Sequence, residues 1–218
     1  MDFVIAVDGT AASGKGTLAE GLAAAYGLPY LDTGLIYRAV GRALRVAGAD
    51  AADPVAAEAA ARTIDLDHLG DPALRTPEAG EDASRAAVHP GVRAALLDAQ
   101  RRFAARPGGA VLDGRDIGTV VAPGAPAKLF VDAALEARAR RRWLQSSAAG
   151  AAATEAEIRE DLRRRDARDR GRSAAPLERA RDAVLLDTTK LSIGEAVEAA
   201  RRIVEAARAR WLETQTAG

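Results

Sequence analysis

The 218-residue chain carries 31 basic and 31 acidic side chains, so its composition implies no overall attraction to nucleic acid or to an anionic membrane. It has no cysteine, and its histidines are His68 and His89, which excludes a disulfide framework, a thiol nucleophile and a metal centre built from these residue types. No apolar run approaches the ~20 residues of a membrane span, and residues 1–9 lack the basic region of a signal peptide. We expect a cytoplasmic protein without membrane or nucleic-acid partners, and the balanced charge favours a monomer.

Short apolar runs alternate with long alanine-rich stretches of helical period. This alternation predicts an α/β fold, with a three-layer parallel sheet flanked by helices. Strands are expected at residues 3–7, 29–31, 110–112, 128–131 and 183–186. Helices are expected at residues 16–26, 35–47, 92–105, 135–145, 155–165 and 193–211, and Asp53 with Pro54 marks the start of another.

Residues 49–90 interrupt this pattern with Gly-Asp-Pro and Thr-Pro punctuation and weak periodicity, which indicates an inserted subdomain. Residues 148–153 are expected to connect two helices as a hairpin. We interpret His68 and His89 as surface or turn residues, and Trp211 as a packing anchor.

The strongest motif is a glycine-rich stretch between the first expected strand and the first expected helix, Gly9-Thr10-Ala11-Ala12-Ser13-Gly14-Lys15-Gly16-Thr17. It fits the pattern G-x-x-x-x-G-K, except that Gly16 separates the lysine from the hydroxyl residue Thr17. Backbone N–H groups of such a loop, with the positive end of the following helix, form a cradle for phosphate. We call residues 9–17 the phosphate loop and expect Lys15 to reach the β- and γ-phosphates of a nucleotide.

The segment Asp32-Thr33-Gly34-Leu35-Ile36-Tyr37-Arg38 follows the second expected strand and opens a helix. Thr33 is expected to cap this helix, and Arg38 to project from its first turns. Alone, the segment fits a capped helix with a solvated arginine equally well. Beside a phosphate loop it indicates a second phosphate site, because ligands of doubly wound sheets bind beyond the carboxyl ends of the strands.

A third expected strand ends in Asp113-Gly114-Arg115-Asp116. Asp113 has the position of a Walker-B acid, which holds Mg²⁺ directly or through water. The alternative is a turn with a local Arg–Asp pair, and spacing alone does not assign Asp116 to metal binding or to base recognition.

Residues 138–172 concentrate arginine in two expected helices, with triplets at 140–142 and 163–165. A solvated helical hairpin, a nucleic-acid patch and a hinged lid that stabilises a transferring phosphoryl group all fit this composition. Consecutive arginines cannot all face one groove, and stacking aromatic residues are missing apart from Trp143. The presence of the phosphate loop favours the lid.

Together these segments resemble the bacterial cytidylate (CMP) kinases of the nucleoside monophosphate kinase group. The resemblance covers nearly the whole chain and rests on DGTAASGKGT (8–17), LDTGLIYRA (31–39), VLDGRDIGTVV (111–121), RRRDARDRGRSAAPL (163–177) and LLDTTKLSI (185–193). Adenylate kinases resemble the first two segments but carry a DGFPR-type sequence at positions 113–116, so that segment discriminates. The loop has Ala12 where many members have glycine, and the stretch between Ile64 and Thr76 is shorter than the usual form and lacks its hairpin.

The resemblance implies a five-stranded parallel P-loop core formed by residues 1–48, 91–137 and 173–218. It implies a monophosphate-binding insertion at residues 49–90 and a mobile helical lid at residues 138–172. The implied reaction transfers the γ-phosphate of ATP to CMP or dCMP, with Mg²⁺ as cofactor.

The resemblance also implies roles for individual residues. The phosphate loop would hold ATP, with Lys15 on the transferring phosphoryl group and with Thr17 and Asp113 near Mg²⁺. The acceptor phosphate would be held by Thr33, Arg38, Arg115 and Arg172. The cytosine would be read by Ser84, Arg93 and Asp116, and the ribose held by Arg165 and Asp169. Catalysis would fall to Lys15, Arg115, Arg172 and Arg141, the last within the triplet that closes over the phosphates.

Two rival functions fit parts of this pattern. One is another kinase of the same group, acting on UMP, AMP or a small hydroxylated metabolite; the last would require a deprotonated hydroxyl, and no separate base is evident. The other is a P-loop switch or RNA-associated NTPase without monophosphate transfer, which would show slow hydrolysis, salt-sensitive RNA affinity and indifference to added nucleoside monophosphates.

Overall fold

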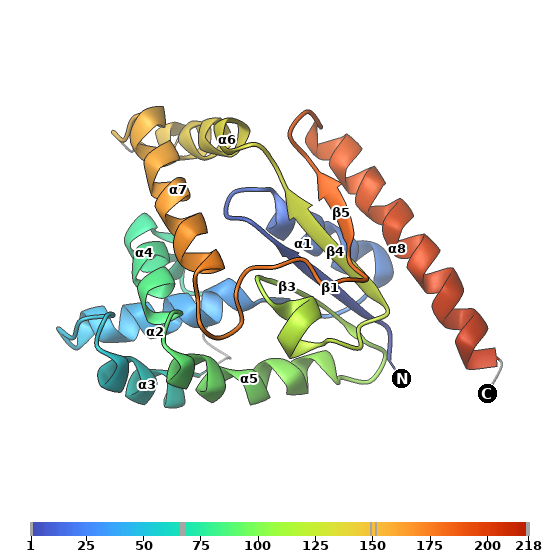
Figure 1. The fold of residues 1–218 in the computed structure, drawn as a ribbon, viewed down its shortest axis with the longest axis horizontal. Helices are drawn as coiled ribbons and strands as arrows, with labels where there is room; N and C mark the ends of the chain where they lie inside the picture. The colour runs from blue at the N-terminus through green and yellow to red at the C-terminus, as the bar shows by residue number, and fades with distance from the viewer. Residues whose placement is uncertain (1, 66–68, 149, 151, 217–218) are drawn as a thin grey trace.

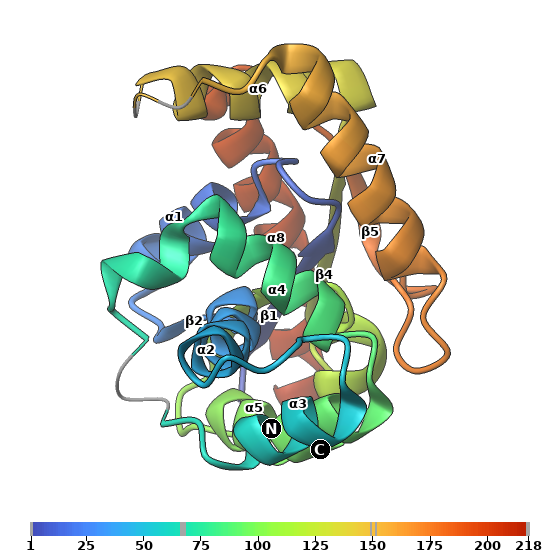
Figure 2. The ribbon, with the colours of Figure 1, turned by 90° about the vertical axis from the view of Figure 1, so that its left-hand side faces the viewer.

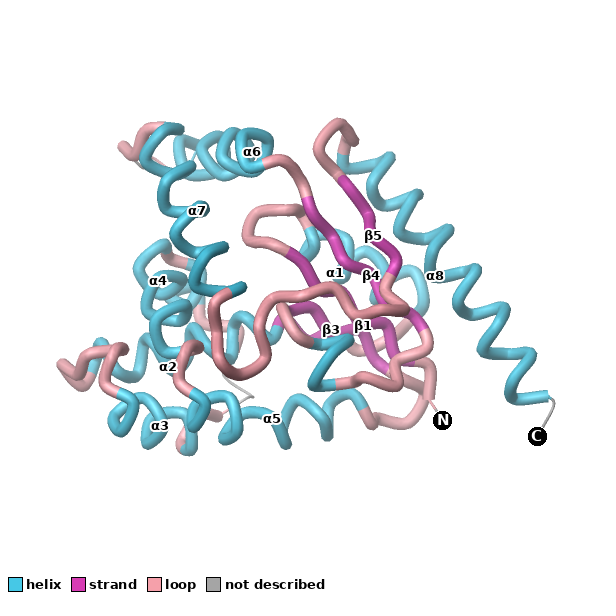
Figure 3. Tube along the Cα trace, in the orientation of Figure 1, coloured by secondary structure: helices cyan, strands magenta, loops and turns pink. Residues whose placement is uncertain are grey.

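The sheet of this protein is formed by five strands that all run parallel. The computed structural model describes residues 2–65, 69–148, 150 and 152–216, so His68 lies outside the described residues. The strands are β1 (Val4–Gly9), β2 (Tyr30–Asp32), β3 (Ala110–Gly114), β4 (Ala127–Asp132) and β5 (Val184–Asp187), in the order β2-β3-β1-β4-β5. All four pairings are parallel, which confirms the predicted fold class and brings the carboxyl ends of the strands to one edge (Figures 1 and 3).

Helices cover both faces of the sheet, and the alternating side chains of β1 explain why. Val4 and Ala6 enter the cluster that packs against α2 (Thr33–Val46) and α5 (Pro90–Ala104), whereas Ile5 and Val7 enter the cluster under α1 (Lys15–Tyr26) and α8 (Ile193–Thr216). A parallel strand buried on both faces reads as a continuous apolar run, which is how β1 was recognisable in the sequence.

The C-terminal helix α8 is anchored where the sequence suggested. The rings of Phe3 and Trp211 lie 5.3 Å apart between centroids, and Trp211 packs against the same cluster as β1. No helix in the described part of the chain combines the length and apolar character needed to cross a bilayer.

The described residues of the expected insertion form helices and no strand. They are α3 (Pro54–Arg62), a 3₁₀ turn (Pro72–Arg75) and α4 (Pro77–Ala86). Asp53 accepts hydrogen bonds from the backbone N–H groups of Val55 and Ala56, so α3 begins where Asp53 and Pro54 predicted. His89 precedes α5 as its N-cap residue, and its Nε2 lies 3.0 Å from the carbonyl oxygen of Ala51, a turn position as expected.

The arginine-rich helices α6 (Leu135–Ala148) and α7 (Glu155–Arg170) form a hairpin beside the carboxyl edge of the sheet. They pack on each other through Ala139, Ile158 and Leu162, and the same small cluster includes Ala11 of the phosphate loop. Figures 1 and 2 show α7 descending from α6 alongside α4. Two residues of the expected connector, 149 and 151, lie outside the described residues.

One turn of π-helix, Ile117–Val121, follows β3 where the sequence analysis predicts no helix. The carboxylate of Asp8, on β1, accepts hydrogen bonds from the backbone N–H groups of Ile117 (2.8 Å) and Gly118 (2.7 Å). Burial raises the pKa of Asp8 to about 7, although these two hydrogen bonds act in the opposite direction. The conformation of residues 117–121 therefore depends on an acid more than 100 residues earlier in the chain.

Candidate functional site

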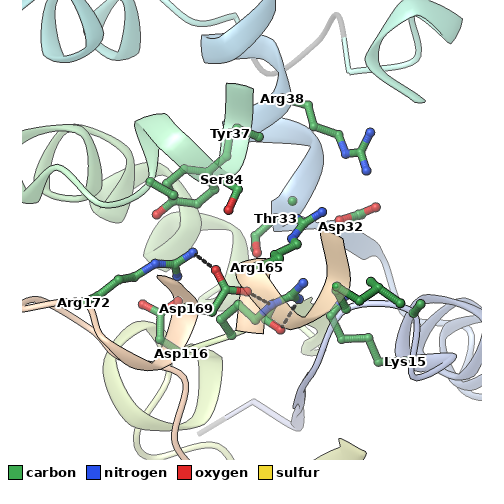
Figure 4. Close-up of a pocket in the computed structure, with 18 of the residues that line it drawn as sticks. Lys15, Asp32, Thr33, Tyr37, Arg38, Ser84, Asp116, Arg165, Asp169 and Arg172 are labelled. Atoms are coloured by element: carbon green, nitrogen blue, oxygen red, sulfur yellow. Dashed lines mark hydrogen bonds and ion pairs between the residues drawn. The ribbon is translucent and has the colours of Figure 1, made fainter. Parts of the chain in front are cut away.

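A pocket opens at the carboxyl edge of the sheet, between the phosphate loop, the start of α2, helix α4 and the α6–α7 hairpin. Its polar lining is drawn in Figure 4, where side chains from these segments converge on a common space. Its charged lining residues are Lys15, Asp32, Arg38, Arg93, Arg115, Asp116, Arg142, Arg165, Asp169 and Arg172. Seven of these are cations and three are carboxylates, so the pocket suits an anionic ligand.

The phosphate loop is fixed through its carbonyl groups, one bound within the loop and two bound by side chains of other segments. The carbonyl oxygen of Thr10 accepts from the Ser13 hydroxyl (2.9 Å), that of Ala11 from Arg138 Nη1 (3.1 Å) and that of Ser13 from the Thr188 hydroxyl (2.9 Å). Because the C=O and N–H of a trans peptide point in opposite directions, carbonyls turned outward leave N–H groups turned inward. The loop thus has the form of an anion cradle.

Glycine is required at two positions of this loop. A Cβ at Gly9 would lie 2.0 Å from the carbonyl oxygen of Val131, so β1 and β4 approach too closely there for any side chain. Gly14, directly before α1, has φ +90°, a left-handed conformation that a residue with a Cβ adopts at a cost. Ala12 nevertheless has φ +61°, which lies in the same left-handed region although this residue carries a Cβ.

Lys15 Nζ lies 2.8 Å from Asp113 Oδ2, and the Tyr30 hydroxyl donates to Asp113 Oδ1 at 2.9 Å. Asp32 pairs in register with Asp113 across the β2–β3 ladder. Burial and the neighbouring charge of Asp113 raise the pKa of Asp32, so this corner holds two carboxylates close to a single lysine. Carboxylates beside a phosphate cradle are the donor set that Mg²⁺ takes in nucleotide sites, so the residues present fit this ion.

Opposite the loop, arginines gather around Asp169. Arg115 Nε donates to Asp169 Oδ2 at 2.9 Å, and Arg172 forms an ion pair with Asp169 Oδ1. Burial raises the pKa of Asp169, but Arg115, Arg172 and Arg165 outweigh it, and the net pKa is lowered. Asp169 is therefore a fixed anion that orients two guanidinium groups.

Arg165 differs from Arg115 and Arg172 in its hydrogen bonding. Its Nε is shielded from solvent and has no hydrogen-bond partner among the described residues. Burial and then the neighbouring charge of Arg115 lower the pKa of Arg165 to about 10. A guanidinium in this state is stabilised by an incoming anion.

A buried ion pair forms part of the pocket lining. Arg93 Nη2 lies 2.5 Å from Asp116 Oδ2, with side chains that are 8% and 9% exposed. The Arg93 guanidinium also lies over the Tyr37 ring at 5.3 Å, and the nearby Ser84 hydroxyl accepts from Arg168 Nε at 3.2 Å. A carboxylate, a guanidinium and a hydroxyl can read the hydrogen-bonding edge of a planar base.

The structure brings most residues predicted from the sequence to this pocket. Those lining it are Ala11, Ala12, Lys15, Thr33, Arg38, Ser84, Arg93, Arg115, Asp116, Arg165, Asp169 and Arg172. Asp113 adjoins it through Lys15, whereas Thr17 lies exposed on the first turn of α1 and outside the lining. Thr33 does not cap α2: Asp32 is the N-cap residue, and the Thr33 hydroxyl donates to the Asp113 carbonyl oxygen at 2.8 Å, so that prediction is wrong.

Arg141 lies outside the pocket lining, and its guanidinium donates to the hydroxyl and carbonyl oxygens of Thr188. Arg142 lines the pocket in its place, because successive helical residues point about 100° apart. Asp32, Tyr37 and Arg138 are site residues without a predicted role. Asp32 and Tyr37 belong to the motif at residues 32–38, whereas nothing in the sequence distinguishes Arg138 from the other arginines of residues 138–172.

Comparison with known proteins settles the family. The family model for cytidylate kinase matches residues 5–206. The chain is 61% identical over 211 residues to a cytidylate kinase of Caulobacter sp. (strain K31), covering 97% of this chain and 98% of that protein. The chain belongs to the cytidylate kinase family. Cytidylate kinases of Xanthobacter autotrophicus and Rhodopseudomonas palustris are 59% and 57% identical over 207 residues, each covering 95% of this chain, with 99% and 98% of those proteins covered.

Membership of the cytidylate kinase family makes this protein a nucleotide-binding phosphotransferase, with ATP as the family's phosphate donor. The match spans the phosphate loop, α4 and the α6–α7 hairpin alike, so every wall of the pocket lies within it.

Proposed function

We propose that this protein transfers the γ-phosphoryl group of ATP directly to the phosphate of CMP or dCMP. The observation that carries the proposal is the excess of arginine over carboxylate in the pocket lining opposite the phosphate loop. One nucleotide's phosphates would occupy the loop, and a second anionic group would satisfy these arginines. An acceptor that already carries a phosphate supplies that second group.

The acceptor phosphate is assigned to Thr33, Arg38, Arg115 and Arg172, and the ribose to Arg165 and Asp169. Arg38 Nη1 donates to the carbonyl oxygens of Leu74 and Thr76, both at 2.9 Å, which anchors one side of the guanidinium and leaves the N–H groups of Nε and Nη2 for a ligand. Hydrogen-bond donors that are already fixed toward a phosphate lower the barrier to phosphoryl transfer, because they need not reorganise as charge develops in the transition state.

The cytosine is assigned to the buried Arg93–Asp116 pair with Ser84. The 4-amino group of cytosine donates hydrogen bonds, which a carboxylate accepts, and its ring nitrogen and carbonyl oxygen accept from a guanidinium. Uracil has a carbonyl oxygen where cytosine has the amino group, so it would place an acceptor against Asp116. The pair therefore favours cytosine.

Transfer requires no general base, since the attacking oxygen belongs to a phosphate that is already ionised. Lys15 and the converging arginines would neutralise charge on the transferring group, with the arginines of the expected lid, residues 138–172, closing over it. Mg²⁺, held through Asp113 with Asp32 adjacent and Thr17 on the first turn of α1, would supply further neutralisation when bound. We expect the enzyme to act as a cytoplasmic monomer.

The test is ADP release from Mg-ATP with CMP, dCMP, UMP, AMP and GMP offered separately. Strong stimulation by CMP and dCMP alone is expected. Stimulation by a different monophosphate would keep the phosphate sites and overturn the base assignments. Stimulation by none of them would overturn the transfer reaction and favour a nucleotide-binding switch.

A further inference from the structure

Arg138 ties the phosphate loop to both helices of the expected lid. It stands on the first turn of α6 and is only 4% exposed. Its Nε donates to the carbonyl oxygen of Ala133 (2.8 Å), its Nη1 to that of Ala11 (3.1 Å) and its Nη2 to Asp166 Oδ2 on α7 (2.7 Å). One guanidinium thus joins the backbone of the phosphate loop, the backbone before α6 and the Asp166 side chain of α7.

The contact with Ala11 controls a particular peptide of the loop. The Ala11–Ala12 peptide is trans, so a carbonyl directed at Arg138 leaves the Ala12 N–H pointing away from it. Both residues line the pocket, so an Ala12 N–H directed away from Arg138 is available to a phosphate bound there. A rotation of this peptide would replace a hydrogen-bond donor with a carbonyl oxygen that repels phosphate.

The backbone conformation of Ala12 favours that rotation. Its φ of +61° is left-handed, a conformation in which the Cβ of an alanine crowds the neighbouring carbonyl. Rotating the preceding peptide would relieve the crowding. A donor held on the Ala11 carbonyl opposes this relaxation, and Arg138 is that donor.

Asp166 fixes the donor in turn. It is 5% exposed, and its Oδ1 has no hydrogen-bond partner among the described residues. A buried carboxylate with one unsatisfied oxygen contributes little to folding stability. Its ion pair does, however, fix the orientation of the Arg138 guanidinium. Because Asp166 belongs to α7, the position of that helix bears on the loop peptide.

We propose that Arg138 is a positioning residue for the phosphoryl donor, which holds the Ala12 N–H toward the donor phosphates and couples that peptide to α7 through Asp166. The inference rests on the proposed ATP site at residues 9–17. It concerns the orientation of one peptide and leaves the acceptor site untouched.

The central test is the double variant Arg138→Met/Asp166→Leu, which removes the ion pair without leaving either charge buried alone. Steady-state KM values for ATP and CMP, ATP affinity by calorimetry and thermal melting are measured together. We expect the KM and dissociation constant for ATP to rise about tenfold and the KM for CMP to change less than twofold. The exposed Arg159→Met on α7 serves as control and should match the wild type.

Ala12→Gly separates positioning from a structural role. The rescue is scored as the ratio of ATP affinities with and without Ala12→Gly, measured in the wild-type background and in the double variant. In the double variant Ala12→Gly should improve ATP affinity about threefold, which is half of the tenfold loss on a logarithmic scale. The reason is that glycine adopts φ +61° without crowding. If the double variant does not fold, the same comparison is made with Arg138→Lys, whose ammonium can pair with Asp166 but lacks the guanidinium fork.

Unchanged ATP affinity in these variants would overturn the proposal. So would equal losses for ATP and CMP that Ala12→Gly does not reduce, since a general loosening of the fold would produce them. A wild-type protein that fails to bind ATP would instead overturn the proposed function, and the calorimetry of the wild type shows which has failed.

Discussion

At the scale of single residues, the charged groups of the pocket differ in the number of hydrogen-bond partners that hold them. Lys15 and Asp113 form a pair at 2.8 Å, and Tyr30 gives Asp113 a second donor. Asp113 therefore keeps one hydrogen bond when Lys15 is removed, and the loop remains held by Thr188 and Arg138. The fold should tolerate the loss of this lysine better than the chemistry does.

Lys15→Met is expected to fold normally and to lose about 100-fold or more in turnover, because a cation aimed at the transferring phosphoryl group is lost. Circular dichroism and kcat for CMP phosphorylation measure the two parts. Lys190→Met, an exposed lysine outside the pocket, should keep the wild-type kcat. Near-normal turnover in Lys15→Met would contradict the assignment of the phosphate loop.

Asp116→Asn is expected to reduce the preference for CMP over UMP at least tenfold, because the amide can donate to the uracil carbonyl as well as accept from cytosine. The KM for ATP should stay within twofold of the wild type. The ratio of kcat/KM for CMP to kcat/KM for UMP, compared between the wild type and Asp116→Asn, measures this preference. Equal losses for both acceptors would argue against a role of Asp116 in reading the base.

Residue types and spacing sufficed to predict the glycine loop and the acid Asp113 at the end of the third strand, whereas most of the pocket arginines were implied only by the family resemblance. Residue types and spacing failed where a side chain's partner lies far along the chain. The Thr33 hydroxyl bonds to the carbonyl of Asp113, 80 residues away, and not to its own helix. Arg141 and Arg142 are indistinguishable in sequence, and only the rotation of α6 about its axis decides which of them faces the pocket.

At the scale of elements, the side chain of Arg168 bridges α7 to α4. Arg168 Nη2 lies 2.6 Å from Glu81 Oε2, and its Nε donates to Ser84 at 3.2 Å. Glu81 and Arg168 are 52% and 29% exposed, so their ion pair is weak, but Ser84 lines the pocket. The bridge thus joins the expected insertion to the expected lid beside the proposed base site.

Arg168→Ala is expected to raise the KM for CMP up to about fivefold, the range of an exposed ion pair together with a loosened Ser84, while the KM for ATP stays unchanged. The exchanged pair Arg168→Glu/Glu81→Arg should recover part of the loss, because the charges still attract. Initial rates at low and high salt measure both effects. If the bridge contributes to CMP binding, high salt should raise the KM for CMP more in the wild type than in Arg168→Ala. An equal effect of salt on both proteins would count against the bridge.

Element boundaries were predictable to within a few residues where apolar runs end in glycine or aspartate, as at β1 and β3. The π-helical turn at Ile117–Val121 was not, because its N–H groups are held by Asp8 of another strand and nothing in the local sequence signals it. Helix α7 continues to Arg170, beyond the predicted end at residue 165, since its last turn is fixed by the pairing of Asp169 with Arg115.

At the scale of the whole molecule, Asp8 makes stability depend on pH. Its pKa is about 7 in the folded state against 3.8 as the ordinary value. Between these values the folded protein holds a proton that the unfolded chain has released, so the contribution of Asp8 is greatest at low pH and is lost as pH rises to about 7.

We expect the part of the unfolding free energy due to Asp8 to fall by up to about 1.4 kcal/mol per pH unit between pH 5 and 7. Asp8→Asn cannot ionise and should flatten this slope, although it is less stable overall because its amide N–H₂ faces a backbone donor. Urea denaturation at several pH values measures the slope. The exposed Asp98→Asn should keep the wild-type slope, and an unaltered slope in Asp8→Asn would contradict the prediction.

The order of the strands has a consequence for how the protein is made. In the central ladders Val4 pairs with Ala110 and Ile5 with Ala127, so β1 leaves the ribosome about a hundred residues before either neighbour exists. At ~5–20 residues per second this delay is on the order of 5–20 s, during which the strand and its loop stay unpaired. The phosphate loop therefore becomes competent for binding only after strands made much later flank β1 on both sides.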